Sequence, residues 1–166
     1  YGFSKISFTD STGTKHKVDT WHAKKAYQQH TKLLESEATA DFARHKAEIS
    51  WRLDSGDEFL REERELTFKL KEQGIEITFA STLSTDLENV ELNGDPQHAG
   101  FQFRASNEVA ESTAKQTYYI RPGSGKAEMG ATINSKNGVM DDERTANLPW
   151  KAMSFVVGGE RYTAVY

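Results

Sequence analysis

The fold is decided by three consecutive segments with the sequences DFARHKAEISWRL (41–53), DSGD (54–57) and EFLREERELTFKLKE (58–72). In the first segment, small and apolar residues alternate with polar ones, which is typical of a half-buried strand. The third segment places Leu66 and Phe68 at the same spacing of two. The polar segment between them carries a hairpin turn signal. We therefore predict two long antiparallel strands joined by a tight turn.

A helix is the alternative for both segments. Phe42, His45 and Ile49 also lie at helical spacing, and the third segment is rich in Glu, Arg, Leu and Lys, which favour helices. We prefer strands because the DSGD turn suits a hairpin and because Ile75 and Ile77 alternate with polar residues directly afterwards. The charged run EERE (62–65) is then interpreted as a solvated strand face with cross-strand ion pairs.

The rest of the chain predicts further short strands separated by turns. They are expected at residues 3–8, 15–20, 26–34, 75–80, 101–104, 117–120, 150–157 and 161–166. The last two are joined by Gly158-Gly159, a two-residue hairpin turn, and residues 121–138 are expected to form an exposed loop region. This pattern predicts a mostly β protein, an antiparallel β-sandwich.

Residues 1–166 are expected to form a single β-sandwich domain or a fragment of one, because the sequence starts and stops within expected strands. Unpaired edge strands at such ends could pair with a second copy, so a homo-oligomer is considered. The length suits one domain.

Composition excludes several classes of protein. The chain has 21 Lys+Arg against 25 Asp+Glu, and this acidic balance argues against a general nucleic-acid binder. The sequence has no apolar run long enough to span a membrane. It has no cysteine, which excludes disulfides, thiolate metal sites and cysteine nucleophiles. The lack of disulfides leaves the compartment open, and we favour a periplasmic or secreted location over a cytoplasmic one.

The stretch HAGFQFR (98–104) carries the main candidate site. On a strand, His98, Gln102 and Arg104 share one face, and Gly100 leaves space above the sheet. A histidine can transfer a proton near neutral pH, while an amide and a guanidinium can bind oxygen atoms of a small molecule. We interpret His98 as an acid/base, and Gln102 and Arg104 as substrate-binding residues. The alternative is that His98 is a hydrogen-bonded structural residue beside a turn.

Other aromatic and histidine residues extend this site. Trp21 and Tyr119 are predicted to bind substrate, since aromatic side chains can stack on a sugar ring. His22 and His30 are considered as ligands of a divalent metal ion, although their spacing fits no short metal motif. The alternative for both histidines is a structural role. The cofactor is therefore left open, with a divalent metal as the one considered.

Four stretches resemble the PmoA-like family, a group of bacterial proteins of unknown function. They are DTWH (19–22), ERELTF (63–68), DPQHAGFQFR (95–104) and NLPWKAMSF (147–155). The resemblance extends over nearly the whole chain and implies a β-sandwich with a role in carbohydrate use. By analogy with the galactose-mutarotase-like supersandwich, it implies a histidine acting as general acid at a sugar ring oxygen. Family members usually carry further segments before Tyr1 and after Tyr166, so we expect an internal part of a longer protein.

Two functions are compatible with these observations. The first is an enzyme that acts on a carbohydrate, as an epimerase, lyase or hydrolase, with His98 as the acid/base. The alternative is a non-catalytic carbohydrate-binding or structural β-sandwich domain. A methane-oxygenase subunit, which the family name suggests, is not expected because such subunits are embedded in membranes.

Overall fold

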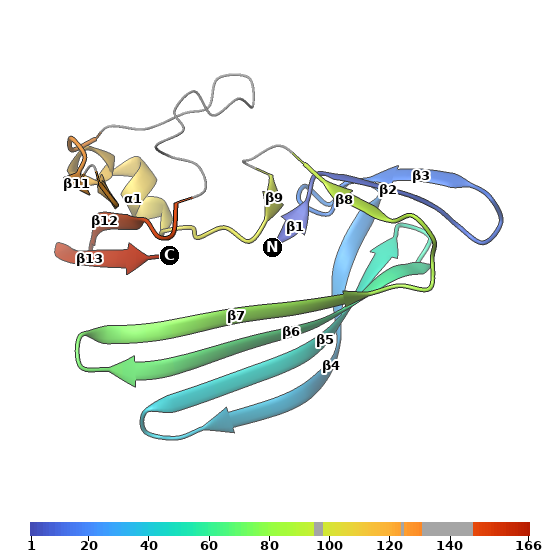
Figure 1. The fold of residues 1–166 in the computed structure, drawn as a ribbon, viewed down its shortest axis with the longest axis horizontal. Helices are drawn as coiled ribbons and strands as arrows, with labels where there is room; N and C mark the ends of the chain where they lie inside the picture. The colour runs from blue at the N-terminus through green and yellow to red at the C-terminus, as the bar shows by residue number, and fades with distance from the viewer. Residues whose placement is uncertain (95–97, 124, 131–147) are drawn as a thin grey trace. The chain divides into compact units, whose positions relative to one another are not determined.

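The computed structural model describes residues 1–94, 98–123, 125–130 and 148–166. These residues form a mostly β structure whose sheets are antiparallel, as predicted (Figure 1). The chain divides into two compact units, residues 1–101 and 102–166, and each is described by itself. The single domain over residues 1–166 stays a prediction.

The largest element of the first unit is a sheet of four long strands. β4 (Ala26–Ala38), β5 (Phe42–Leu53), β6 (Glu58–Lys71) and β7 (Gly74–Ser84) follow one another as an antiparallel meander. Figure 1 shows them as four long adjacent ribbons. The strand prediction for residues 41–53 and 58–72 is thus confirmed. Cross-strand pairing and burial override the helix propensity of the Glu, Arg, Leu and Lys residues.

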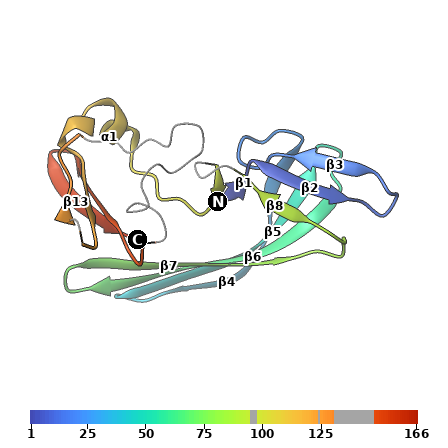
Figure 2. The same cartoon turned by 45° about the horizontal axis from the view of Figure 1, so that its top comes forward.

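A smaller sheet packs on one end of this large sheet. Its central strand β2 (Lys5–Thr9) lies between β3 (Lys15–Val18) and β8 (Glu91–Asn93). Figure 2 shows the three short strands above one end of the four long ones. The two layers share one hydrophobic core, made by Ile6, Phe8, Val18, Ala26, Ile49, Trp51, Phe59 and Leu60. The first unit is therefore a two-layer β-sandwich.

Two very short strands complete the first unit. β1 (Gly2–Phe3) pairs antiparallel with β9 (Ala99–Gly100). The predicted strand at residues 101–104 is wrong, since the chain has no strand between Gly100 and α1. The physical reason is Gly100, whose φ of +76° lies in the left-handed region and turns the chain out of the extended conformation.

In the second unit, the described residues form a four-stranded sheet and two short helical turns. α1 (Asn107–Glu111) and a 3₁₀ turn, η1 (Ala114–Gln116), precede the sheet, whose strand order is β11-β10-β12-β13. The strands are β10 (Tyr118–Arg121), β11 (Gly125–Lys126), β12 (Ala152–Val157) and β13 (Glu160–Val165).

The closing hairpin of this unit agrees with the sequence. Gly158 and Gly159 have φ values of 58° and 83°, and both lie between paired Val157 and Glu160. This is the two-residue turn that was predicted. Within the predicted loop at residues 121–138, Gly125–Lys126 forms a short strand, while residues 124 and 131–138 lie outside the described residues.

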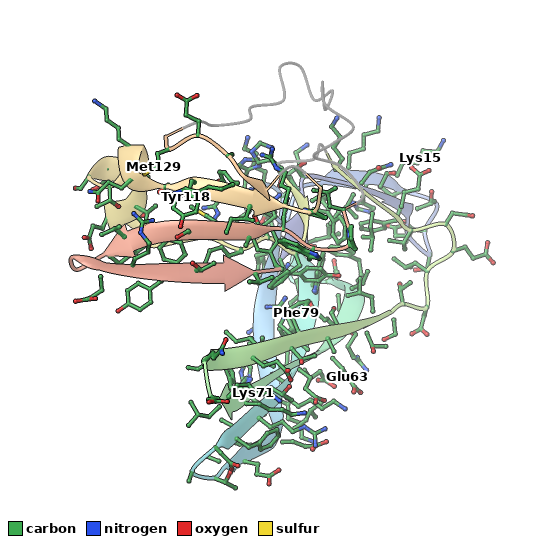
Figure 3. The ribbon with its side chains drawn as sticks, turned by 60° about the vertical axis from the view of Figure 1, so that its left-hand side comes forward. Lys15, Glu63, Lys71, Phe79, Tyr118 and Met129 are labelled. Carbon is green, nitrogen blue, oxygen red and sulfur yellow. The ribbon has the colours of Figure 1, made fainter. Side chains whose placement is uncertain are left out.

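The far end of the large sheet leaves apolar side chains exposed. Leu70 is 59%, Ile75 is 65% and Ile77 is 59% exposed, and all three lie near the β6–β7 turn. Figure 3 labels Phe79 on β7, further toward the core, and Glu63 on β6, and strand register places these two residues on opposite faces. β4 and β7 are the edges of this sheet, and a homo-oligomer through edge strands stays a prediction.

The EERE run on β6 divides between the two faces of the sheet. Glu63 and Glu65 form the expected cross-strand ion pairs, with Lys46 at 2.8 Å and with Arg44 at 3.1 Å. The interpretation of the whole run as a solvated face is wrong, because Glu62 is fully buried. The period of two of a strand puts Glu62 and Arg64 on the inner face, where the Arg64 guanidinium lies 5.5 Å from the centroid of the Tyr1 ring.

The Glu62 carboxylate is the centre of a buried polar network. It accepts hydrogen bonds from Trp51 Nε1 at 2.9 Å, from Ser81 Oγ at 2.8 Å and from Arg64 Nε at 2.8 Å. Arg64 also donates to Gln28 Oε1 at 2.9 Å. The hydrogen bonds of Glu62 and Arg64 therefore connect all four strands of the large sheet. The Arg64 guanidinium neutralises the buried Glu62 carboxylate.

We predict that Glu62→Ala destabilises the protein by about 3–5 kcal/mol, because it leaves Arg64 without its buried partner. Urea unfolding monitored by circular dichroism measures the loss. Glu63→Ala is the matched control on the opposite face, and we expect it to cost less than about 1 kcal/mol. Equal losses for the two variants would contradict a central role for the network.

A second carboxylate organises the turn between β2 and β3. Asp10 accepts hydrogen bonds from Thr12 Oγ1 at 2.6 Å, from the Thr12 and Thr14 backbone N–H groups, and from His16 Nε2 at 2.7 Å. The Thr12 hydroxyl, followed by the His16 ring, holds the pKa of Asp10 well below its ordinary value. The His16 ring in turn stacks on Phe8 of the core, with ring centroids 4.7 Å apart. The ionised form of Asp10 therefore stabilises this hairpin.

This lowered pKa predicts a pH dependence of stability. Because the pKa of Asp10 is lower in the folded state, its contribution is complete above the unfolded value of 3.8 and is lost as the pH falls below it. We expect Asp10→Asn to be less stable than the wild type at about pH 7, and the difference to shrink toward about pH 3. Urea unfolding across this pH range measures it. Asp54→Asn, in the exposed β5–β6 turn, is the control, and an unchanged difference at all pH values would contradict the prediction.

Candidate functional site

The short strand β1 and the residue after it bring two distant loops together. The Phe3 carbonyl accepts hydrogen bonds from the Thr20 and Trp21 backbone N–H groups at 3.0 and 3.3 Å. The Ser4 N–H donates to the His98 carbonyl at 2.9 Å. The loop at residues 19–25 and the segment around His98 are therefore held on one short stretch of backbone.

Glycine at position 94 is required for this arrangement. A Cβ atom at Gly94 would lie 2.8 Å from both the Ala99 Cβ and the His98 carbonyl oxygen. Real Cβ atoms do not approach other atoms so closely, so any larger residue would displace the backbone of His98. Glycine at position 94 thus allows the chain to pass in contact with the backbone of His98.

The loop at residues 19–25 has a strained but well-defined backbone. Asp19 and Lys24 exchange two backbone hydrogen bonds, at 3.0 and 2.8 Å, and so close the loop. Ala23 and Lys25 have φ values of 52° and 64°, which cost a non-glycine residue about 1–2 kcal/mol each. The loop presents Trp21 and His22 between these closing contacts.

Asp19 orients His22. Its Oδ1 accepts the His22 backbone N–H at 2.8 Å, and its Oδ2 lies 2.7 Å from His22 Nδ1. Burial favours the neutral form of Asp19, but the hydrogen bonds and charge of His22 outweigh it, so the pKa of Asp19 is lowered. An ionised carboxylate only accepts hydrogen bonds, so Nδ1 of His22 must carry a proton. The other ring nitrogen, Nε2, is then the one available for proton transfer.

His98 and Trp21 lie beside this pair. The His98 ring centroid is 5.0 Å from that of His22 and 5.8 Å from that of Trp21, whose ring meets it edge-on. Three residues predicted from the sequence, Trp21, His22 and His98, are thus neighbours. Together with Asp19 we call them the histidine cluster.

The other predicted substrate-binding residues belong to the second unit. Gln102 is its first residue, and Arg104 and Tyr119 line a cavity of about 310 Å³ together with Val109 and Met153. The expectation that one strand face carries His98, Gln102 and Arg104 is wrong, because no strand extends beyond Gly100 there. The substrate-binding roles of Gln102, Arg104 and Tyr119 stay predictions.

The metal prediction concerned His22 and His30. His30 is exposed on β4, opposite Ile49 of β5, whereas His22 pairs with Asp19. Across residues 1–94, 98–123, 125–130 and 148–166, no group of three or more His, Cys, Asp or Glu side chains could hold a metal ion. The metal role of the two histidines remains a prediction.

Asp19 is the site residue that the sequence interpretation missed. It stands three positions before His22 in the DTWH stretch. An Asp that caps a backbone N–H a few residues later is a common turn signal, and here the same side chain also reaches the ring. The signal was present in the sequence, but only the bend of the loop shows that both oxygens meet His22.

Comparison with known proteins gives a family but no function. No helix among the described residues is long and apolar enough to cross a membrane. Neither a curated protein nor a solved structure matches the chain. One family model, described as a family of unknown function, matches residues 4–166. The resemblance to the PmoA-like family stays a prediction. The chain belongs to this family, DUF6807.

Proposed function

We propose that the protein binds a carbohydrate at the histidine cluster and acts on it by proton transfer, with His98 as an acid/base. The observation that carries the proposal is the hydrogen bond of 2.7 Å between Asp19 and His22, beside the ring of His98. A histidine oriented by a carboxylate is the usual arrangement of a general base.

The spacing of the two imidazole rings supports chemistry that needs an acid and a base together. With ring centroids 5.0 Å apart, one ring can accept a proton from a bound molecule while the other donates one. His22 is the better-oriented base because Asp19 fixes its tautomer. His98 is then the acid, in keeping with the role predicted for it.

The same geometry favours some reactions on carbohydrates over others. Glycoside hydrolysis uses two carboxyl groups on either side of the scissile bond, and the one carboxylate in the histidine cluster, Asp19, is engaged by His22. Epimerisation and elimination need proton removal and proton return, which two histidines supply. Trp21 adds an apolar ring face of the kind on which sugars stack. An epimerase or lyase is therefore favoured over a hydrolase.

A non-catalytic binding role is the second function that a specific observation favours. The cavity in the second unit combines the Arg104 guanidinium and the Tyr119 ring with apolar side chains such as Val109 and Met153. An apolar cavity with one cation and one aromatic ring suits the binding of a small ligand without chemistry.

We predict that His98→Ala and His22→Ala each lower the rate of proton exchange by about 10²–10⁴-fold, because each removes one partner in proton transfer. The measurement is deuterium incorporation from D₂O into a panel of aldoses and uronic acids, followed by ¹H NMR. Asp19→Asn is expected to lower the rate as well, because it removes the charge that orients His22.

His45→Ala is the matched control, since His45 is an exposed histidine on β5 outside the histidine cluster. Wild-type exchange rates in the His98→Ala variant would refute the catalytic proposal. Binding without exchange, lost in Tyr119→Ala and retained in His98→Ala, would support the non-catalytic role instead.

A further inference from the structure

A lysine-rich cleft lies beside the histidine cluster. It has a volume of about 580 Å³ and is formed by the small sheet and the loop at residues 19–25. Lys5, Lys17, Lys24 and Lys25 line it, together with the carboxylates of Asp19 and Glu91. A volume of this size is in the range of small-molecule binding sites. We call this the lysine cleft.

The strand period explains why the lysines gather there. Ile6 of β2 and Val18 of β3 are buried between the two sheets. Their neighbours Lys5 and Lys17 therefore point to the opposite, outer face. Strand register places Lys17 opposite Ser7 and Lys5 opposite Asn93, so the outer face of three strands contributes to one wall.

The four lysines of the lysine cleft are not neutralised by the carboxylates that line it. Its two carboxylates already accept hydrogen bonds, Asp19 from His22 and Glu91 from Ser7 at 3.0 Å. Among the described residues, no ion pair within 4 Å involves any of the four lysines of the lysine cleft. Four cations against two carboxylates form a local positive excess in a chain with a net charge of −4. Such an excess attracts anions.

A buried hydroxyl adds a second observation. Ser4 also lines the lysine cleft, and its Oγ is buried without a hydrogen-bond partner in the described part of the chain. A buried polar atom without a partner is costly, and such atoms often mark the place of a bound water, ion or ligand. An oxyanion in the cleft, reached directly or through a water, would satisfy it.

The lysine cleft and the histidine cluster share one residue. Asp19 lines the cleft and also binds His22, and the backbone of Lys24 is paired with that of Asp19. A ligand that reaches from the histidine cluster past Asp19 would therefore enter the lysine cleft. We infer that the carbohydrate of the proposed function is acidic, and that the lysine cleft binds its carboxylate.

This inference rests on the proposed function. It assigns the lysine cleft and the histidine cluster to the same reaction. Cations beside a sugar carboxylate stabilise the negative charge that develops when the adjacent C–H bond loses its proton. The base of the histidine cluster removes that proton, and the acid returns one to the same carbon or to a departing oxygen. A uronic acid is therefore the substrate class that uses both sites.

Calorimetric titration tests the inference. We expect galacturonate or glucuronate oligomers to bind at least about ten-fold more tightly than the matched neutral oligomers, because a charge-assisted hydrogen bond supplies more than a factor of ten. Binding should weaken as NaCl rises from about 50 to about 500 mM. Equal affinity for neutral and acidic oligomers, or no binding of any uronate, would overturn the inference. Tight binding of an oligomer that carries sulfate esters and no carboxylate, without binding of a uronate, would overturn the assignment of a carboxylate as the bound anion.

Charge-matched variants locate the anion. Lys5→Gln/Lys17→Gln removes two charges from the lysine cleft and should weaken uronate binding about ten-fold or more. Lys32→Gln/Lys69→Gln removes two charges from β4 and β6, outside the cleft, and should change affinity less than about two-fold. Equal losses in both variants would overturn the cleft as the site. If uronate binding depends on the lysines but no deuterium exchange follows, the anion site is supported. Only the catalytic part of the proposed function is then refuted.

Discussion

The buried carboxylate of Glu62 is the constraint on which the rest of the first unit depends. It is bound by Trp51 of β5, Arg64 of β6 and Ser81 of β7, and Arg64 reaches Gln28 of β4. Gln28 donates to the Tyr1 carbonyl at 3.1 Å, directly before β1. Since β1 and the following residue hold both loops of the histidine cluster, the geometry of that cluster is connected to a charge in the core.

A buried ion pair is seldom the most stable solution for a core, because desolvation offsets most of the attraction between the charges. Its value here is in fixing strand register. The EERE run has glutamates at two neighbouring positions, and a slip of β6 by one residue would exchange Glu62 for Glu63 on the inner face. Only the observed register brings Trp51 Nε1, Ser81 Oγ and the guanidinium to the same carboxylate.

The strands could be predicted from the sequence because residues 41–53 and 58–72 keep a period of two over many positions, whereas their helical spacing is partial. The inner position of Glu62 could not be predicted, because a glutamate on a strand is normally solvated. Two of its partners, Trp51 and Ser81, come from the neighbouring strands β5 and β7. Three residues of the histidine cluster, Trp21, His22 and His98, are predictable from the sequence, whereas Asp19 and the arrangement of the four side chains are not. His98 was placed on a strand with Gln102 and Arg104, yet the left-handed φ of Gly100 ends that strand and the loop at residues 19–25 supplies its neighbours instead.

The conformation of that loop links the two proposed sites. Ala23 and Lys25 adopt left-handed φ values although glycine would adopt them without cost, and such strain concentrates at functional sites. The bend of the loop places the His22 ring against Asp19. It also brings Lys24 and Lys25 to the lysine cleft. Two backbone hydrogen bonds between Asp19 and Lys24 close the loop and hold this conformation. One bend of the backbone thus positions both groups, as a site for an anionic ligand next to a proton-transfer pair requires.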